Sequence, residues 1–218
     1  MRVLFVSRRF YPDIIGGGEI SPFVLAKALS KLNVDVHVLT FTNKNPYYEE
    51  IKGGKIHRQK IKILNRFPRF SNMDFMYWQI AKATIKFVKN LNPTIVHLLN
   101  FESIPYTSFI LKRKFPKISI CATVNGPCFG CFTGEALDHK EKTCLKCRTF
   151  KRWSCCTNKW GYLKGSLFYL YSLWYIPLLK ISYKYVDRFF LVSKAMIPIL
   201  ENMNVPKKKM KIVYNPID

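Results

Sequence analysis

The strongest constraint on the fold of this chain is a repeated alternation between short apolar segments and longer segments with helical periodicity. Residues 3–7 form an apolar run, which is typical of a parallel strand buried on both faces. Residues 20–32 then place their apolar side chains on one face of a helix. Val34, Val36 and Val38 alternate with polar residues and indicate a second strand. A strand, a loop, a helix and a strand with short connections predict a right-handed βαβ crossover.

The same alternation continues along the chain and predicts an α/β fold with a Rossmann-like, doubly wound parallel sheet. A strand or a hairpin is expected at residues 55–63, and further strands are expected at residues 94–99, 118–124, 188–192 and 211–214. Further helices are expected at residues 73–91, 104–114, 162–184 and 194–203. Residues 125–160 break the pattern and are interpreted as a cysteine-rich insertion. We therefore expect one domain over residues 1–210, with residues 211–218 beginning a linker to a second domain.

The composition is that of a globular protein with a strongly basic charge balance. Hydrophobic residues make up 49% of the 218 residues, which is enough for a sizeable core. Lysine and arginine number 36 against 13 aspartate and glutamate residues, and the excess is spread along the chain. Such a charge attracts nucleic acid, an anionic membrane or phosphate-bearing substrates, and a generally basic proteome would also produce it.

The sequence shows no segment typical of a secretory signal or of a membrane-spanning helix. The opening apolar run is too short for a signal peptide. The longest uncharged stretch, residues 165–179, is shorter than the roughly 20 residues that cross a bilayer. We therefore expect a cytoplasmic protein whose seven cysteines stay reduced.

Three consecutive glycines, Gly16, Gly17 and Gly18, lie between the first predicted strand and the first predicted helix. Glycine lets a ligand approach the backbone there, and a helix N-terminus offers free N–H groups, so a phosphate group is the expected ligand. The loop lacks the spacing of a dinucleotide-binding motif or of a P-loop. No acidic residue ends the second strand, which disfavours a nicotinamide cofactor. A glycine-rich turn without any ligand is the alternative.

The order of several short motifs resembles glycosyltransferase family four. The opening of that family is matched by residues 3–7, 11–12, 16–19, 25–29 and 34–38. Later matches follow in the family's order, at residues 92–97, 123–126, 190–194 and 211–218. The resemblance implies the N-terminal, acceptor-side domain of a GT-B fold. It also implies transfer of a sugar, with retention of anomeric configuration, from a nucleotide-sugar donor to a glycan or lipid-linked acceptor.

The resemblance further implies which residues contact the donor. Gly16, Gly17 and Gly18 would bind the donor phosphates. Asn125 stands where many family members have a histidine near the transferred sugar, so it is the candidate catalytic residue. An asparagine can form a hydrogen bond with a hydroxyl group but cannot exchange a proton near neutral pH. No catalytic metal is inferred.

His97 and Glu102, near the end of the strand expected at residues 94–99, are the candidate acceptor-binding residues. A core histidine and a solvated carboxylate are the alternatives. The family's second domain, which carries paired glutamates and basic phosphate ligands, would follow Asp218. We therefore expect catalysis to need that domain, or a partner chain that supplies it. A non-catalytic remnant of a truncated transferase gene is a further alternative.

Two pairs of cysteines form the sharpest local pattern in the sequence. Cys128 and Cys131 form one C-x2-C pair, and Cys144 and Cys147 form the other after twelve intervening residues. Four thiolates in this spacing suit a structural Zn²⁺ site with no open position for catalysis. Disulfides, free thiols or an iron–sulfur cluster are the alternatives. Further candidate ligands are Cys155, Cys156 and His139.

Residues 162–184 combine many aromatic and leucine residues with several lysines. Such a helix suits the interface of an anionic membrane, so we expect the protein to lie at the inner face of the plasma membrane. A core helix kinked by Pro177 is the alternative. The charge and the cysteine pairs also fit a zinc-knuckle protein that binds nucleic acid, but that hypothesis leaves the chain-wide alternation of strands and helices unexplained.

Overall fold

The computed structural model describes residues 1–14, 16–62, 69–138, 140, 142–144, 147 and 149–216, with the backbone alone for residues 69–72. One eight-stranded sheet has the order β3-β4-β2-β1-β5-β6-β7-β8. The strands are β1 (Arg2–Val6), β2 (Asp35–Thr42), β3 (Tyr47–Ile51), β4 (Gly54–Lys60), β5 (Ile95–Leu98), β6 (Ser119–Val124), β7 (Arg188–Leu191) and β8 (Met210–Ile212). The α-helices are α1 (Gly17–Lys31), α2 (Arg69–Leu91), α3 (Thr107–Lys114), α4 (Thr149–Trp160), α5 (Tyr162–Lys184) and α6 (Ile197–Asn202). Short 3₁₀ turns are η1 (Phe101–Ser103), η2 (Pro127–Phe129), η3 (Lys194–Met196) and η4 (Lys207–Lys209).

Neighbouring strands of the sheet are parallel, except that β3 and β4 form an antiparallel hairpin at one edge. β1 lies in the middle of the sheet between β2 and β5, and the direction of winding reverses there. In such sheets the loops that leave the central strands diverge and open a crevice at their carboxyl ends. The predicted α/β fold with a largely parallel sheet is therefore confirmed.

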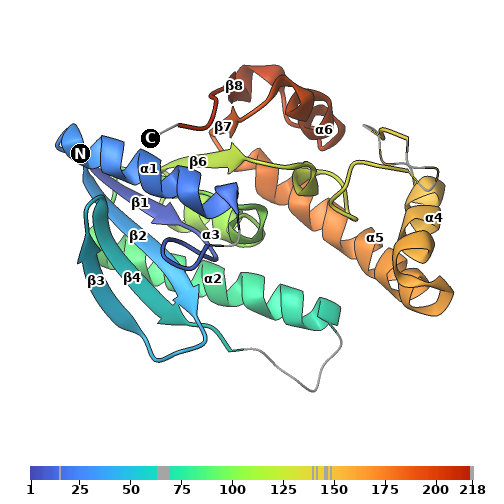
Figure 1. The fold of residues 1–218 in the computed structure, drawn as a ribbon, viewed down its shortest axis with the longest axis horizontal. Coiled ribbons are helices and arrows are strands. Elements are labelled where there is room, and N and C mark those ends of the chain that lie inside the picture. The colour runs from blue at the N-terminus through green and yellow to red at the C-terminus, as the bar shows by residue number, and fades with distance from the viewer. Residues whose placement is uncertain are drawn as a thin grey trace.

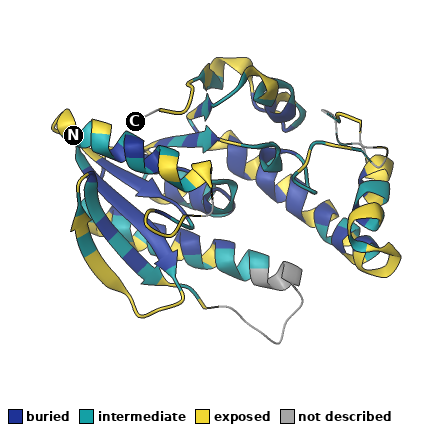
Figure 2. Ribbon diagram, in the orientation of Figure 1, coloured by how far each residue is buried: buried dark blue, intermediate teal, exposed yellow. Residues whose placement is uncertain are grey.

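Helices cover both faces of the sheet (Figure 1). α1 packs on one face, where Ala26 joins a core cluster with Val3 and Val38. α2, α3, α5 and α6 pack on the other face, where Tyr77 of α2 joins a larger cluster with Leu4. Figure 2 shows the central strands as the most buried part of the sheet, whereas the edge strand β3 is largely exposed. Burial on both faces explains why a central strand such as β1 is an apolar run in the sequence.

Several element boundaries differ from those expected. α1 begins at Gly17, three residues before the expected start, and Pro22 lies in its second turn. The helix ends as predicted, because Asn33 adopts a left-handed conformation with φ of +57°. α4 was not expected from the sequence, where residues 125–160 were interpreted as a cysteine-rich insertion, and only Arg152 and Cys156 of its side chains are buried. The helix expected at residues 194–203 is divided into η3 and α6.

A buried arginine fastens the β3–β4 hairpin to the loop that follows β1. The side chain of Arg58 is fully buried. Its Nε donates to Oε1 of Glu49 over 2.6 Å and its Nη1 to Oδ2 of Asp13 over 3.2 Å. Its Nη2 donates to the carbonyl oxygen of Tyr11 over 2.5 Å. A buried guanidinium is tolerated only when such acceptors surround it, so the hairpin and the loop hold each other in place.

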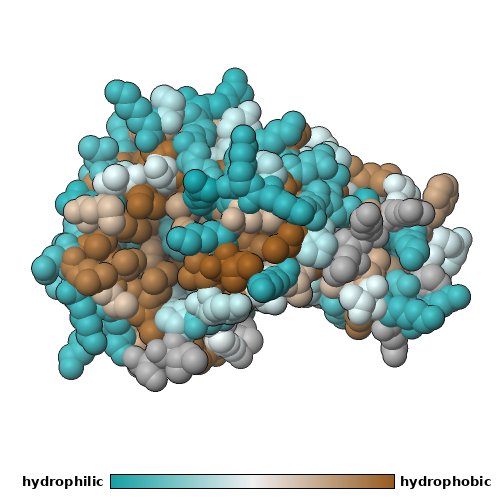
Figure 3. Space-filling view, turned by 90° about the horizontal axis from the view of Figure 1, so that it is seen from above, coloured by the Kyte–Doolittle hydropathy of each residue, from teal (hydrophilic) through white to brown (hydrophobic). Residues whose placement is uncertain are grey.

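α4 and α5 form a helical hairpin that extends away from the sheet (Figure 1). Gly161 between them has φ of +79°, a conformation that favours glycine. A Cβ on Gly165 would overlap the carbonyl oxygen of Cys156 and lie 2.5 Å from Cα of Thr157, so this close approach requires glycine. Seen from above, this end of the molecule is narrower than the end that holds the sheet (Figure 3). Within the described residues, no helix combines the length and the hydrophobicity needed to cross a bilayer.

Candidate functional site

A pocket of about 280 Å³ opens where the direction of winding reverses, near the carboxyl ends of β1, β5 and β6. One wall is the first two turns of α1, and the other comes from residues at the ends of β5 and β6. Its lining residues are Gly17, Gly18, Ser21, Pro22, Leu25, Leu99, Thr123, Asn125 and Asn215. This glycine pocket, as we name it, lies where doubly wound sheets bind their ligands.

Gly18 and Asn125 face each other in the glycine pocket. A Cβ on Gly18 would lie 3.4 Å from Nδ2 of Asn125. The structure thus brings the donor-binding candidates Gly17 and Gly18 together with the candidate catalytic residue, while their roles stay predictions. Gly16 does not line the pocket but acts as the N-cap of α1, and its N–H donates to Oε2 of Glu19 over 2.9 Å.

The N-terminus of α1 gives the glycine pocket an affinity for anions. N–H groups in the first turn of a helix lack helical acceptors, and the helix dipole places partial positive charge there. In the described part of the chain, no atom lies within 4 Å of the Cβ positions of Gly16 and Gly17. The backbone of this turn is therefore open to a phosphate group.

Ser21 and Asn215 line the glycine pocket although they are far apart in the sequence. The Ser21 hydroxyl donates to Oδ1 of Asn215 over 2.9 Å and joins α1 to the segment that follows β8. Neither residue was among the predicted site residues. Asn215 lies in the motif at residues 211–218 that matches the family, but nothing along the sequence singles out Ser21, because a helical serine is common on any surface.

His97 lies behind the glycine pocket, not in it. Its imidazole is buried between Phe5 and Phe190, and Nε2 lies 2.8 Å from the hydroxyl oxygen of Thr123. Burial lowers the pKa of His97 to about 4, so the ring is neutral near pH 7. These contacts are those of a core histidine that positions Thr123, and a direct role in acceptor binding is not tested by them.

Glu102 lines a second, larger pocket of about 980 Å³ at the carboxyl ends of β1, β2 and β4. Nη1 of Arg8 lies 3.4 Å from Oε1 of Glu102. Burial raises the pKa of Glu102, although the neighbouring Arg8 favours the ionised form. The structure therefore places the acceptor-binding candidates His97 and Glu102 apart. We name this the basic pocket after four of its lining residues, Arg8, Arg9, Lys44 and Lys62.

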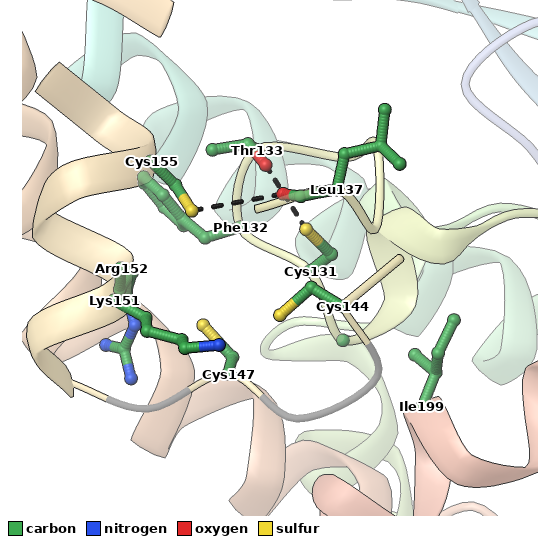
Figure 4. Close-up of a pocket in the computed structure, with 11 residues that line it drawn as sticks. Cys131, Phe132, Thr133, Leu137, Cys144, Cys147, Lys151, Arg152, Cys155 and Ile199 are labelled. Atoms are coloured by element: carbon green, nitrogen blue, oxygen red, sulfur yellow. Dashed lines mark hydrogen bonds between the residues drawn. The ribbon is translucent and has the colours of Figure 1, made fainter. Parts of the chain in front are cut away.

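The cysteine-rich segment lines neither of these pockets. Cys131, Cys144 and Cys147 line a separate cavity beside α4, and Cys155 of α4 lines the same cavity (Figure 4). Cys128 is not among its lining residues. That side chain packs against the main core cluster, and burial raises its pKa to about 12.

Among the residues that the structure describes, no group of three or more His, Cys, Asp or Glu side chains already has the arrangement of a metal site. The candidate ligand His139 lies outside the described residues. All seven cysteines are free of disulfide bonds. Zinc at Cys128, Cys131, Cys144 and Cys147 therefore stays a prediction.

Comparison with known proteins gives a family match over nearly the whole chain. The sequence model of Glycosyltransferase Family 4 matches residues 15–218. No curated protein sequence matches the chain. The matched region includes almost all of the alternating strands and helices, which the nucleic-acid-binding hypothesis left unexplained.

Solved structures share the fold at low sequence identity. The apo form of the lipopolysaccharide outer core galactosyltransferase WaaB is 13% identical with a TM-score of 0.50, covering 100% of this chain and 46% of that one. HepE of Anabaena in complex with UDP-glucose is 9% identical with a TM-score of 0.53, covering 100% and 44%. A UDP-forming α,α-trehalose-phosphate synthase from Burkholderia vietnamiensis is 11% identical with a TM-score of 0.51, covering 92% and 42%. The likeness shows the fold of a GT-B N-terminal domain, and the chain spans less than half the length of these three proteins.

Proposed function

Because the chain belongs to glycosyltransferase family 4, we propose that it is the acceptor-side domain of an enzyme that transfers a hexose from a nucleotide-sugar donor. The acceptor is a glycan or a lipid-linked glycan. The main support for the proposal is the glycine pocket, in which the open N-terminus of α1 and the amide of Asn125 line the same space. HepE, which shares the fold, was solved with UDP-glucose, and this supports a nucleotide sugar as the donor.

The glycine pocket supplies part of the donor site. Backbone N–H groups of Gly17 and Gly18 bind the donor phosphates, as a helix N-terminus does for anions. The amide of Asn125 donates a hydrogen bond to the transferred sugar, but it cannot act as an acid or base near pH 7. The chain spans less than half the length of these solved proteins. A donor-binding domain, on the same or a partner chain, therefore completes the site.

The basic pocket binds the acceptor. Arg9, Lys44 and Lys62 line it, and none of these side chains has an ion-pair partner among the described residues. Glu102 accepts a hydrogen bond from an acceptor hydroxyl group. The apolar part of the wall is formed by Phe41, Ile61, Met73, Met76 and Tyr77. A wall that is cationic in one part and apolar in another suits a phosphate-bearing, lipid-linked acceptor.

A stripe of exposed apolar side chains runs along α5 and supports attachment to a membrane. Figure 2 shows exposed positions recurring along this helix. They are spaced four, three, four and seven residues apart, which places them on one helical face: Leu163, Leu167, Leu170, Trp174 and Ile181. The exposed Lys164 and Lys184 flank the stripe. Such a face lies in the interface of an anionic membrane, so the protein is cytoplasmic and peripheral at the inner face of the plasma membrane.

A structural metal ion in the cysteine-rich segment belongs to the same proposal. The cysteines line neither the glycine pocket nor the basic pocket, so the ion has no part in sugar transfer. A site with four thiolate ligands also leaves no open position for a substrate. The ion instead stabilises the segment between β6 and α4.

The test is amide NMR spectroscopy of the 218-residue chain during titration with UDP-glucose and other nucleotide sugars. Resonances of Gly17, Gly18 and Ser21 are expected to shift first. A phosphorylated lipid analogue is expected to shift resonances around Lys44 and Lys62 instead. If no nucleotide sugar shifts the glycine-pocket resonances at saturating concentration, the proposed donor site is wrong.

A further inference from the structure

We infer that Cys131, Cys144, Cys147 and Cys155 bind one structural Zn²⁺ ion, with Cys155 in the place that the sequence spacing assigns to Cys128. The inference deepens the structural-metal part of the proposed function and does not depend on sugar transfer. The four side chains line one cavity and come from three segments (Figure 4). These are the loop after η2, the segment that precedes α4, and α4 itself.

The four thiol groups form one cluster. Sγ of Cys131 lies 3.2 Å from the hydroxyl oxygen of Thr133, and Sγ of Cys155 lies 3.9 Å from the carbonyl oxygen of Leu137. All four side chains line this one cavity, so one ion held there can reach all of them after local side-chain movement.

Cys128 belongs to a different environment. It lies in η2 and packs partly buried against the main core cluster. It does not line the cavity that Cys131, Cys144, Cys147 and Cys155 share. The spacing alone cannot reveal this, because it does not show where a side chain points.

Besides the shared cavity, a second observation indicates that the four cysteines are anionic when they bind a metal: a buried arginine lies in the wall of the same cavity. Arg152 is only 8% exposed and lines the cavity. Its Nη1 donates to the carbonyl oxygen and to the hydroxyl oxygen of Ser172, each over 3.2 Å. Within the described residues, its Nε has no hydrogen-bond partner and no carboxylate pairs with its guanidinium. Cys147 lines the same cavity.

A zinc ion bound by four thiolates supplies the negative charge that the buried guanidinium of Arg152 requires, whereas disulfides do not. A buried guanidinium needs an anion, and Zn²⁺ with four thiolates carries net negative charge. Two disulfides among the four cysteines would leave neutral sulfur atoms beside the cation. Zinc binding forms four Zn–S bonds of about 2.3 Å and releases the thiol protons to water. The sulfur atoms must move together for this, because the described residues do not yet have the arrangement of a metal site.

The test compares zinc content among single-cysteine variants of the full chain. The unmodified protein is expected to hold one zinc per chain by elemental analysis after gel filtration. Cys155→Ser is expected to weaken zinc binding at least about 100-fold, since even second-shell changes cost 10- to 100-fold. Cys128→Ser and Cys121→Ser, the matched controls outside the cavity, are expected to keep their zinc. Loss of zinc from Cys128→Ser but not from Cys155→Ser would overturn the proposed ligand set.

A measurement on the unmodified protein avoids variants that fail to fold. The protein is alkylated with N-ethylmaleimide, with and without a zinc chelator, and each cysteine is quantified by peptide mass spectrometry. Removal of zinc is expected to accelerate labelling of Cys131, Cys144, Cys147 and Cys155 at least tenfold, and to leave Cys128 unchanged. Protein without zinc, or with disulfides in place of these thiols, overturns the inference. Neither readout involves nucleotide sugars, so failure of the transferase proposal would leave this result unaffected.

Discussion

Nε2 of His97 and the hydroxyl oxygen of Thr123 lie 2.8 Å apart, and this pair joins the buried core to the wall of the glycine pocket. Because burial lowers the pKa of His97 from 6.5 to about 4, the unfolded chain binds more protons than the folded protein between those values. The contribution of His97 to stability is therefore complete above pH 6.5 and is lost as the pH falls toward 4. The expected loss is about 3 kcal/mol.

Denaturant unfolding of the native protein and of His97→Gln at several pH values measures this contribution. The amide can keep a hydrogen bond to Thr123 but does not titrate, so the variant is expected to lose the pH dependence in that window. Other groups also titrate there, and only the difference between the two proteins is diagnostic. Parallel pH profiles for the two proteins would contradict the burial of a neutral imidazole.

Replacement of Arg58 is expected to loosen the edge hairpin. In Arg58→Met, Glu49 and the carbonyl oxygen of Tyr11 lose their buried donor. We expect a loss of about 2–4 kcal/mol in the free energy of unfolding. Arg8→Met is the matched control, because Arg8 is half-buried and makes a single longer ion pair. Equal effects of the two substitutions would show that Arg58 is not a structural link.

Gly165 is expected to tolerate no side chain. In Gly165→Ala the new Cβ meets backbone atoms of Cys156 and Thr157, which cannot move aside as a flexible side chain could. Thermal and chemical unfolding are expected to show a loss of about 1–3 kcal/mol. Gly16→Ala should stay within about 0.5 kcal/mol of the native protein, since its Cβ position is open and its φ is extended.

Gly17→Ala is expected to weaken nucleotide-sugar binding without lowering the free energy of unfolding. No described atom lies within 4 Å of the new methyl group, so the free energy of unfolding should not fall. The methyl group would stand where a phosphate approaches the helix N-terminus. Nucleotide-sugar binding by NMR titration is therefore expected to weaken at least about tenfold, a difference of roughly 1.4 kcal/mol. Unchanged binding would place the phosphate elsewhere.

The stripe on α5 is expected to control attachment to membranes. The native chain should sediment with vesicles that contain phosphatidylserine and less with vesicles of phosphatidylcholine alone. Leu167→Ser combined with Leu170→Ser should weaken vesicle binding at least about tenfold, because burial of one leucine contributes about 1.5–3 kcal/mol. Ile20→Ser is the control, since Ile20 is similarly exposed but lies on α1. An equal loss in the control would show that the stripe is not the part of the surface that contacts the membrane.

The sheet and most helices could be predicted because their apolar periodicity reflects burial in one regular architecture. The left-handed Asn33 and the apolar run of β1 are local signals of this kind. α4 escaped detection because its packing onto α5 depends on Gly165, a contact with a separate helix. Patterns within one segment predict an element well only where that segment's own apolar residues show which side is buried.

The candidate site was predictable only in part. The glycine loop and Asn125 could be found because a glycine run and a motif order are visible along the chain. Ser21 and Asn215 meet only through the fold. The position of Cys155 likewise follows from the direction of a helix that begins at Thr149, which places Lys151 and Cys155 on one side of α4.

The reversal of winding between β1 and β5 has a consequence for engineering. Divergent chain paths create the crevice there, so its existence does not depend on the side chains that line it. Lining positions such as Ser21 and Asn215 can therefore be exchanged to change ligand preference while the sheet stays folded. The positions that set ligand selectivity are therefore separate from those that determine folding. A library of variants with substitutions only at crevice-lining positions should contain mostly soluble proteins.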